Sequence, residues 1–219
     1  MSRLSKSYLI AYNGISAVLW LAILQTSMWD IIAVKIYHDS SNYYISHQFE
    51  GDFPHKLLVY TQLFNSIMEI IHSLTGIVKS PIPTLIVQAA ARSLITLGIN
   101  YTLPQSPGNY HFVFFNMIIW AWSTSDIIRY IFFSFKLLYT NSQPPYWLIW
   151  LRYSAFLMLY PIGLISESSV VYLSLSVVTK NTAYYYFLLF GLSSYLPGLY
   201  FLYGYMLKQR KKVLSKKNN

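Results

Sequence analysis

The sequence predicts an all-α, polytopic membrane protein whose six transmembrane helices form one bundle. Hydrophobic residues make up 55% of the 219 residues and charged residues only 11%, whereas a soluble domain is about one quarter charged. Aromatic residues reach 18% and include 21 tyrosines, and tyrosine favours the membrane interface. The apolar residues also gather in segments of about 20, which is enough to cross a hydrocarbon core ~30 Å thick.

Six segments qualify as membrane spans. They cover residues 8–29, 57–78, 82–103, 111–138, 146–166 and 182–207. The first is expected to be retained, because it is longer than a signal-peptide core and has no small-residue cleavage site. Pro81 and Pro83 open the third span, where the first N–H groups have no helical partner in any case. Residues 1–219 are expected to form a single membrane domain, with residues 208–219 as a basic cytosolic tail.

The basic residues predict the orientation. Six of the sixteen Lys and Arg residues follow residue 207, so the net charge of +9 indicates a basic tail rather than a nucleic-acid surface. Six spans place ten basic residues on the side of the termini and three on the other side, which favours cytosolic termini. Lys216 and Lys217 resemble a dilysine signal for retrieval to the endoplasmic reticulum. The alternative is a basic tail that touches anionic lipid.

The chain has no cysteine. Disulfides, cysteine-ligated metals and thiol catalysis are therefore excluded. The sequence also contains no glycine-rich phosphate loop and no histidine cluster. We therefore expect neither a metal nor a nucleotide cofactor.

Ionisable residues inside the spans are the strongest functional signal. Each charge at the bilayer centre costs at least ~2.5–3.5 kcal/mol, so such groups pair with one another or serve a function. Because they are spread over four spans, a shared polar cavity is favoured over simple helix–helix contacts. Asp126 and Arg129, three residues apart on one helix, are expected to pair. The residues concerned are Glu69, His72, Arg92, Asp126, Arg129, Arg152 and Glu167.

The fifth span places a phenol and a carboxyl on one helical face. Tyr160 and Glu167 are seven residues apart, which is two turns and about 10 Å along the axis. Pro161 and Gly163 lie between them, where a kink would bring the two groups nearer to one substrate. The alternative interpretation is a tyrosine in the interfacial belt and a glutamate at the helix end.

Several motifs, taken in order, resemble those of one known family. They are Tyr12-Asn13-Gly14-Ile15-Ser16-Ala17, Glu69-Ile70-Ile71-His72-Ser73, Ala91-Arg92-Ser93, Ala121-Trp122-Ser123, Ile127-Ile128-Arg129-Tyr130, Leu151-Arg152-Tyr153, Leu159-Tyr160-Pro161-Ile162-Gly163, Ser166-Glu167 and Tyr195-Leu196-Pro197-Gly198. Together they resemble the very-long-chain (3R)-3-hydroxyacyl-CoA dehydratases, once called protein-tyrosine-phosphatase-like. The likeness covers nearly the whole chain and is greatest to the fungal member of the endoplasmic reticulum. The older label carries no weight, because Cys-dependent phosphatase chemistry needs a cysteine.

The resemblance implies the third step of fatty-acid elongation, in which a 3-hydroxyacyl-CoA loses water to give a trans-2-enoyl-CoA. It implies Tyr160 and Glu167 as the catalytic pair. Glu167 is favoured as the base at the α-carbon and Tyr160 as the proton donor to the hydroxyl. The reverse assignment stays open, because Arg152 or Arg92 can stabilise a phenolate. The supporting or substrate-binding residues are Arg152, Arg92, Gly163, Arg129, Asp126 and Glu69.

The resemblance also implies partners and shows one departure. The expected partners are the long-chain 3-hydroxyacyl-CoA substrate, membrane lipid and other elongation enzymes, namely the condensing enzyme and the reductases. The family usually has Glu where this chain has Asp126, which weakens the case for contact between that carboxylate and the substrate. Two rival functions remain: a small transporter or channel, which often has repeated halves that this chain lacks, and a non-catalytic scaffold of the elongase complex, which Tyr160 and Glu167 disfavour.

Overall fold

The computed structural model describes residues 3–37, 55–139 and 143–215, and every regular element in these ranges is helical. The elements are α1 (Arg3–Tyr37), α3 (Lys56–Leu74), α4 (Ile82–Ile95), η1 (Thr96–Tyr101), α5 (Pro107–Tyr110), α6 (Phe112–Leu138), α7 (Tyr146–Ser154), α8 (Phe156–Ser174), η2 (Leu175–Val177), α9 (Ala183–Gly198), η3 (Leu199–Tyr203) and α10 (Gly204–Ser215). The dilysine Lys216–Lys217 and most of the acidic loop that follows the first span lie outside the described residues.

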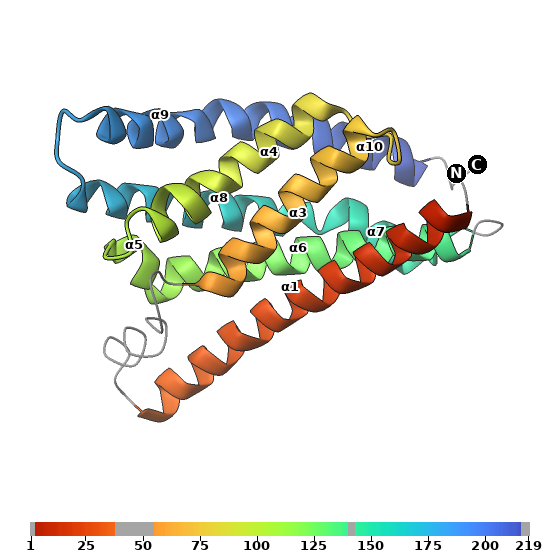
Figure 1. The fold of residues 1–219 in the computed structure, drawn as a ribbon, viewed down its shortest axis with the longest axis horizontal. Coiled ribbons are helices and arrows are strands. Elements are labelled where there is room, and N and C mark those ends of the chain that lie inside the picture. The colour runs from red at the N-terminus through yellow and green to blue at the C-terminus, as the bar shows by residue number, and fades with distance from the viewer. Residues whose placement is uncertain (1–2, 38–54, 140–142, 216–219) are drawn as a thin grey trace.

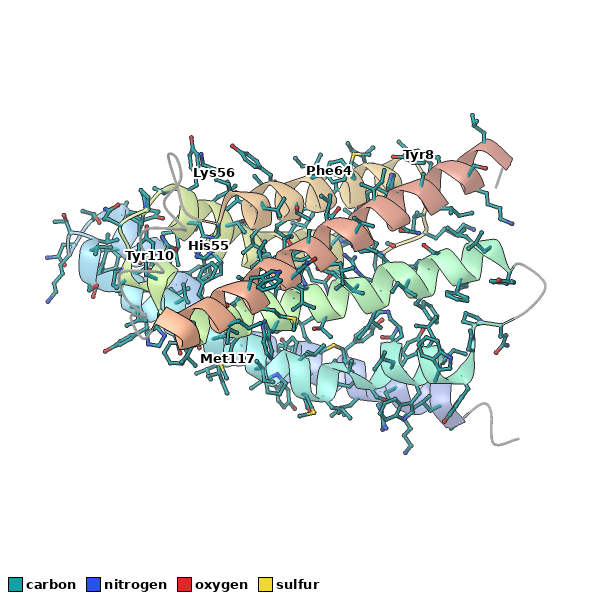
Figure 2. The ribbon with its side chains drawn as sticks, turned by 90° about the horizontal axis from the view of Figure 1, so that it is seen from below. Tyr8, His55, Lys56, Phe64, Tyr110 and Met117 are labelled. Atoms are coloured by element: carbon teal, nitrogen blue, oxygen red, sulfur yellow. The ribbon has the colours of Figure 1, made fainter. Side chains whose placement is uncertain are left out.

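The long helices lie side by side in one elongated bundle (Figure 1). Helix α6 packs between α1 and α8, α9 packs on the outer side of α8, and α3 packs against α1 and α4. The first turn of α1 and the last turn of α10 lie at the same end of the bundle. In Figure 2, Tyr8 lies at this end, whereas His55 and Tyr110 lie at the opposite end.

Four described helical segments are long and apolar enough to cross a membrane. They are Leu4–Trp29, Ile82–Tyr101, Tyr146–Val177 and Ala183–Ser215. The chain is therefore a multi-pass helical membrane protein, but the prediction of six spans is not confirmed. The other two predicted spans correspond to α3 and α6, whose apolar residues are diluted by polar and charged side chains. These two helices carry Glu69, Asp126 and Arg129, which form the polar centre of the bundle.

The helix that carries Tyr160 is longer than predicted. The sequence indicated a span that ends at residue 166, whereas the apolar helical segment runs from Tyr146 to Val177, a total of 32 residues. Tyr160 consequently lies close to the middle of this segment. Helix α8 is continuous through Pro161, and the interruption falls at Ala155, between α7 and α8. The helix break therefore precedes Tyr160 instead of separating it from Glu167.

A close helix contact anchors the far end of α8. A Cβ atom on Gly108 of α5 would lie only 2.6 Å from the carbonyl oxygen of Val170, so only glycine permits this approach. The hydroxyls of Ser106 and Ser174 are hydrogen-bonded next to this contact, at 2.6 Å. Both hydroxyls are completely buried. The contact fixes α8 against the connection that leads into α6.

Two π-helical segments occur, η1 at the end of α4 and η3 between α9 and α10, and at each a tyrosine hydroxyl is bonded to a glycine carbonyl. Tyr184 donates to the carbonyl of Gly98 within η1. Tyr160 donates to the carbonyl of Gly198, the residue directly before η3, at 3.2 Å. A π-segment disturbs the regular backbone ladder and is often found at a functional site. The second of these segments binds a predicted catalytic residue.

Candidate active site

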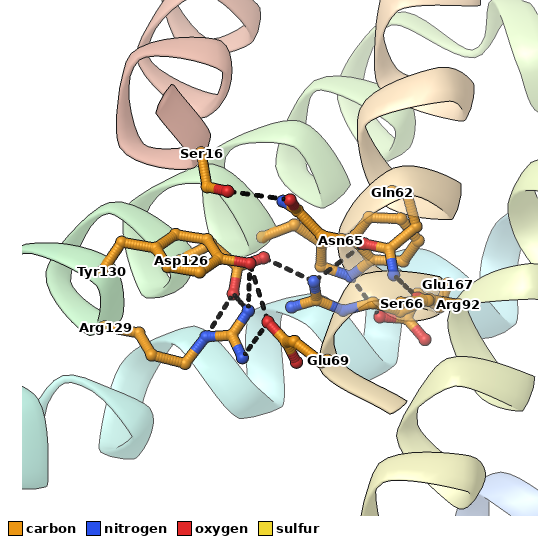
Figure 3. A network of polar contacts seen from close by, with 11 residues as sticks. Ser16, Gln62, Asn65, Ser66, Glu69, Arg92, Asp126, Arg129, Tyr130 and Glu167 are labelled. Carbon is orange, nitrogen blue, oxygen red and sulfur yellow. Dashed lines mark hydrogen bonds and ion pairs between the residues drawn. The ribbon is translucent and has the colours of Figure 1, made fainter. Parts of the chain in front are cut away.

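Asp126 is the centre of a buried ionic network (Figure 3). Its Oδ2 atom accepts a bond from Arg92 at 2.5 Å. Its Oδ1 atom accepts bonds from Nε of Arg129 at 3.0 Å and from Nη2 at 2.9 Å. The side chain is 3% exposed. The predicted pair between Asp126 and Arg129 is therefore confirmed, and Arg92 from α4 is joined to the same carboxylate.

Glu69 closes the other side of this network. Its Oε1 atom lies 2.7 Å from Nη1 of Arg129 and accepts a hydrogen bond from the Tyr130 hydroxyl at 2.7 Å. Arg129 also donates to that hydroxyl at 2.9 Å. The network thus alternates two arginines with two carboxylates and is electrically neutral. The side chains of Glu69, Arg92 and Arg129 keep 21–23% of their surface accessible, so one side of the network is open.

Two other polar residues of α3, Asn65 and His72, face α1 instead of this network. Asn65 accepts a hydrogen bond from Ser16 at 2.9 Å. The ring of His72 is hydrogen-bonded to the Tyr8 hydroxyl at 2.8 Å. The polar residues of α3 therefore have different partners, with Glu69 bonded to α6 and with Asn65 and His72 joining α3 to α1.

Glu167 reaches the network through an indole. Its Oε1 atom accepts a hydrogen bond from Nε1 of Trp122 at 2.6 Å, and the guanidinium carbon of Arg92 lies 4.9 Å from the centre of the same indole. Gly163 leaves room beside the carboxylate, since a Cβ there would lie 3.7 Å from Oε1. The Tyr195 hydroxyl is buried next to Glu167 without completing a hydrogen bond of normal geometry.

Tyr160 faces a different helix. Its hydroxyl donates to the Gly198 carbonyl, and its ring lies 5.9 Å from the ring of Tyr203. The unbroken helix keeps the two-turn rise of about 10 Å between Tyr160 and Glu167. The two groups flank a region bounded by α6 on one side and by α9 with η3 on the other, and no hydrogen bond joins them.

Arg152 stands apart from the network. It belongs to α7, before the interruption at Ala155. Its guanidinium carbon lies 6.0 Å from the ring centres of both Phe133 and Tyr153. Within the described part of the chain it has neither an ion pair nor a hydrogen bond. Its donors are therefore available to a ligand.

The structure thus brings together four of the predicted residues and connects a fifth. Glu69, Arg92, Asp126 and Arg129 form one network, and Glu167 touches it through Trp122. Sequence reasoning assigned no role to Trp122, Tyr130 or Gln62, which accepts from Arg92 at 2.9 Å. A glutamine within an apolar segment was a visible signal, whereas an indole in a membrane helix is typical of the lipid interface. In the described ranges no three His, Asp or Glu side chains lie close enough to hold a metal ion.

Comparisons with known proteins agree on one family. The family model for protein tyrosine phosphatase-like protein, PTPLA, matches residues 63–216. The chain is 35% identical to a probable very-long-chain (3R)-3-hydroxyacyl-CoA dehydratase of Schizosaccharomyces pombe, over 97% of this chain and 96% of that one. It is 38% identical to the dehydratase PASTICCINO 2 of Arabidopsis thaliana over 69% and 72% of the two chains, and 32% identical to dehydratase 1 of Canis lupus familiaris over 92% and 84%. No solved structure matches the chain.

Proposed function

This chain belongs to the protein tyrosine phosphatase-like, PTPLA, family, and from that membership we propose that it dehydrates very-long-chain (3R)-3-hydroxyacyl-CoA to the trans-2-enoyl-CoA. It is a hydro-lyase of very-long-chain fatty-acid elongation. The observation that carries this conclusion is the end-to-end match to the fission yeast relative, whose name states this activity. Tyr160 and Glu167, in the middle of the bundle, supply the two proton-transfer groups that the reaction needs.

The reaction follows from these two side chains. The Glu167 carboxylate takes the proton from the carbon next to the thioester, and the electron pair forms the new C=C bond. The C–O bond at the β-carbon breaks, and the Tyr160 hydroxyl protonates the departing oxygen to give water. Glu167 then carries a proton and Tyr160 a negative charge. Transfer of that proton to the phenolate, through the released water, restores both groups.

The contacts of Glu167 fit the role of a base. A carboxylate that is paired with an arginine has its lone pairs occupied and is a poor proton acceptor. Glu167 has no such pair among the described residues, because Arg92 is bound to Gln62 and Asp126 instead. One oxygen accepts a hydrogen bond from Trp122, and we assign the other oxygen to the substrate.

Tyr160 must exchange one hydrogen bond to act as the donor. Its hydroxyl donates a hydrogen bond to the Gly198 carbonyl, and rotation about the C–O bond of the phenol redirects the O–H towards a substrate hydroxyl. Catalytic hydrogen bonds commonly form only in the substrate complex. The backbone carbonyl therefore holds the phenol in place until the substrate arrives.

Turnover of the purified protein tests the assignment. Detergent-solubilised protein is supplied with 3-hydroxyacyl-CoA and the enoyl product is measured. We expect Tyr160→Phe and Glu167→Gln each to lower kcat at least about 100-fold, as removal of an acid or a base does. Tyr172→Phe is the matched control, because Tyr172 lies on the same helix and is 67% exposed. Near-normal turnover in either variant removes that residue from the mechanism, and no turnover by the unaltered protein overturns the function.

We further propose that six helices cross the endoplasmic reticulum membrane, with both termini in the cytosol. The ten-to-three distribution of basic residues and the position of the first turn of α1 and the last turn of α10 at one end of the bundle (Figure 1) support this topology. Tags at the two ends should both be digested by protease added to sealed microsomes, and protection of one tag contradicts it. The condensing enzyme and the reductases of the same cycle are the proposed partners, to be sought by co-purification.

A further inference from the structure

Trp122 is the one described residue that makes a hydrogen bond of normal geometry to Glu167. The residue lies on α6 and is only 4% exposed. Its Nε1–H bond to Oε1 measures 2.6 Å, which is short for an N–H donor and typical of a bond to a charged acceptor. Most interfacial tryptophans direct the indole N–H to lipid headgroups or water. This indole is instead directed inward, at a carboxylate on the neighbouring helix.

The other side of the same indole is held by a cation. Arg92 lies over the ring at 4.9 Å, within the range of a cation–π contact. Arg92 is itself fixed by Asp126 and Gln62. The indole therefore lies between the ionic network and Glu167. It fixes the carboxylate relative to the network without giving the carboxylate an ion-pair partner.

We propose that Trp122 is a positioning residue for the dehydration, holding Oε1 of Glu167 so that Oε2 faces the substrate. This role rests on the proposed function. A direct arginine pair would hold the carboxylate equally firmly but would suppress its basicity. A single indole donor orients the group and leaves it able to take a proton. The stacked Arg92 prevents the indole from turning away.

Substitution by phenylalanine removes the N–H donor and keeps an aromatic ring for Arg92. A hydrogen bond to a charged group is lost, so we expect kcat of Trp122→Phe to fall by about 10- to 100-fold. KM should stay within about twofold, because Trp122 does not touch the substrate. Trp122→His should recover part of the rate, since Nε2 of histidine occupies the ring position of the indole nitrogen. A residue that merely fills space would not be rescued in this way.

Trp120→Phe is the matched control, because this tryptophan lies two residues away on α6. Its indole donates to Ser27 at 3.1 Å instead of to Glu167. Its kcat should match that of the unaltered protein. Equal losses in Trp120→Phe and Trp122→Phe, or no loss in Trp122→Phe, overturn the positioning role while turnover by the unaltered protein upholds the function. If the unaltered protein does not turn over, the function fails and this role fails with it.

Poor folding of Trp122→Phe does not prevent the test. Thermal stability is then compared in a double-mutant cycle with Glu167→Gln. If the indole bonds Glu167, the two changes in stability are coupled and do not add. Additive changes overturn the proposed contact.

Discussion

The network around Asp126 and the pair formed by Tyr160 and Glu167 both place ionisable groups inside the bundle, but they use their bonding capacity differently. Asp126 accepts on both oxygens from two arginines. Glu167 accepts one hydrogen bond, from a neutral indole. Tyr160 donates a hydrogen bond to a backbone carbonyl, and the Tyr195 hydroxyl lies near Glu167 without a hydrogen bond of normal geometry to any described residue.

This difference separates structure from chemistry. A charge whose lone pairs or protons are all bound to protein has little left to offer a substrate, and its removal exposes its partners. A group with spare bonding capacity is expensive to bury and persists where it has a function. The ion-paired network therefore joins α3, α4 and α6, whereas Tyr160 and Glu167 of α8, which have no ion pair among the described residues, are the candidates for proton transfer.

The largest effect expected outside the catalytic pair is the loss of stability in Asp126→Asn. An amide leaves the positive charges of Arg92 and Arg129 without their shared partner. Breaking such a buried pair costs about 3–5 kcal/mol. Thermal unfolding in detergent measures this loss of stability. A variant with full stability and no turnover would instead assign Asp126 a role in the reaction, and the distinction between a structural network and a catalytic pair would be wrong.

Two arginines sharpen the comparison. Arg129 has three hydrogen-bonded partners in the network. Arg129→Lys should lower stability by about 1–3 kcal/mol, because one ammonium cannot reproduce the directed donors of the planar guanidinium.

Arg152 has no polar partner among the described residues. Arg152→Lys should keep stability within about 0.5 kcal/mol and lower turnover about tenfold, because a ligand then loses directed donors. Thermal stability and initial rates are measured for both variants. If both lose stability, or both lose only turnover, the proposed difference between Arg129 and Arg152 is wrong.

Sequence patterns predicted the elements of this site better than their contacts. The pairing of Asp126 with Arg129 followed from helical spacing alone. The attachment of Arg92 to Asp126 did not, because it depends on how α4 packs against α6. Spacing also placed Tyr160 and Glu167 on one helix, yet only packing determines that one faces α9 and the other α6.

The predicted spans diverged from the structure for a related reason. Apolar length identified the helices, but α3 and α6 face a polar interior and therefore resemble the lipid-facing helices less closely. The fifth span was predicted to end at residue 166, whereas the helix continues through the small polar residues that follow Glu167. They are compatible with a longer helix because Ser168 and Ser169 bond the carbonyl of Ile165, within their own helix.

The smallest expected effect is that of Gly163→Ala. A Cβ at this position would meet the Ala121 Cβ at 3.6 Å and Oε1 of Glu167 at 3.7 Å, both ordinary contacts. Alanine also favours a helix interior by about 0.8–1.0 kcal/mol over glycine. We therefore expect unchanged or slightly higher thermal stability. Turnover should nevertheless fall a few-fold, roughly the factor that 1 kcal/mol gives, because the methyl group contacts the catalytic carboxylate and reduces the space beside it. Gly14→Ala is the control, since a Cβ on this helical glycine would meet no described atom within 4 Å. If Gly163→Ala loses stability and turnover together, the glycine is needed for the packing of α8 on α6. The space between Gly163 and Glu167 is then too small for a methyl group.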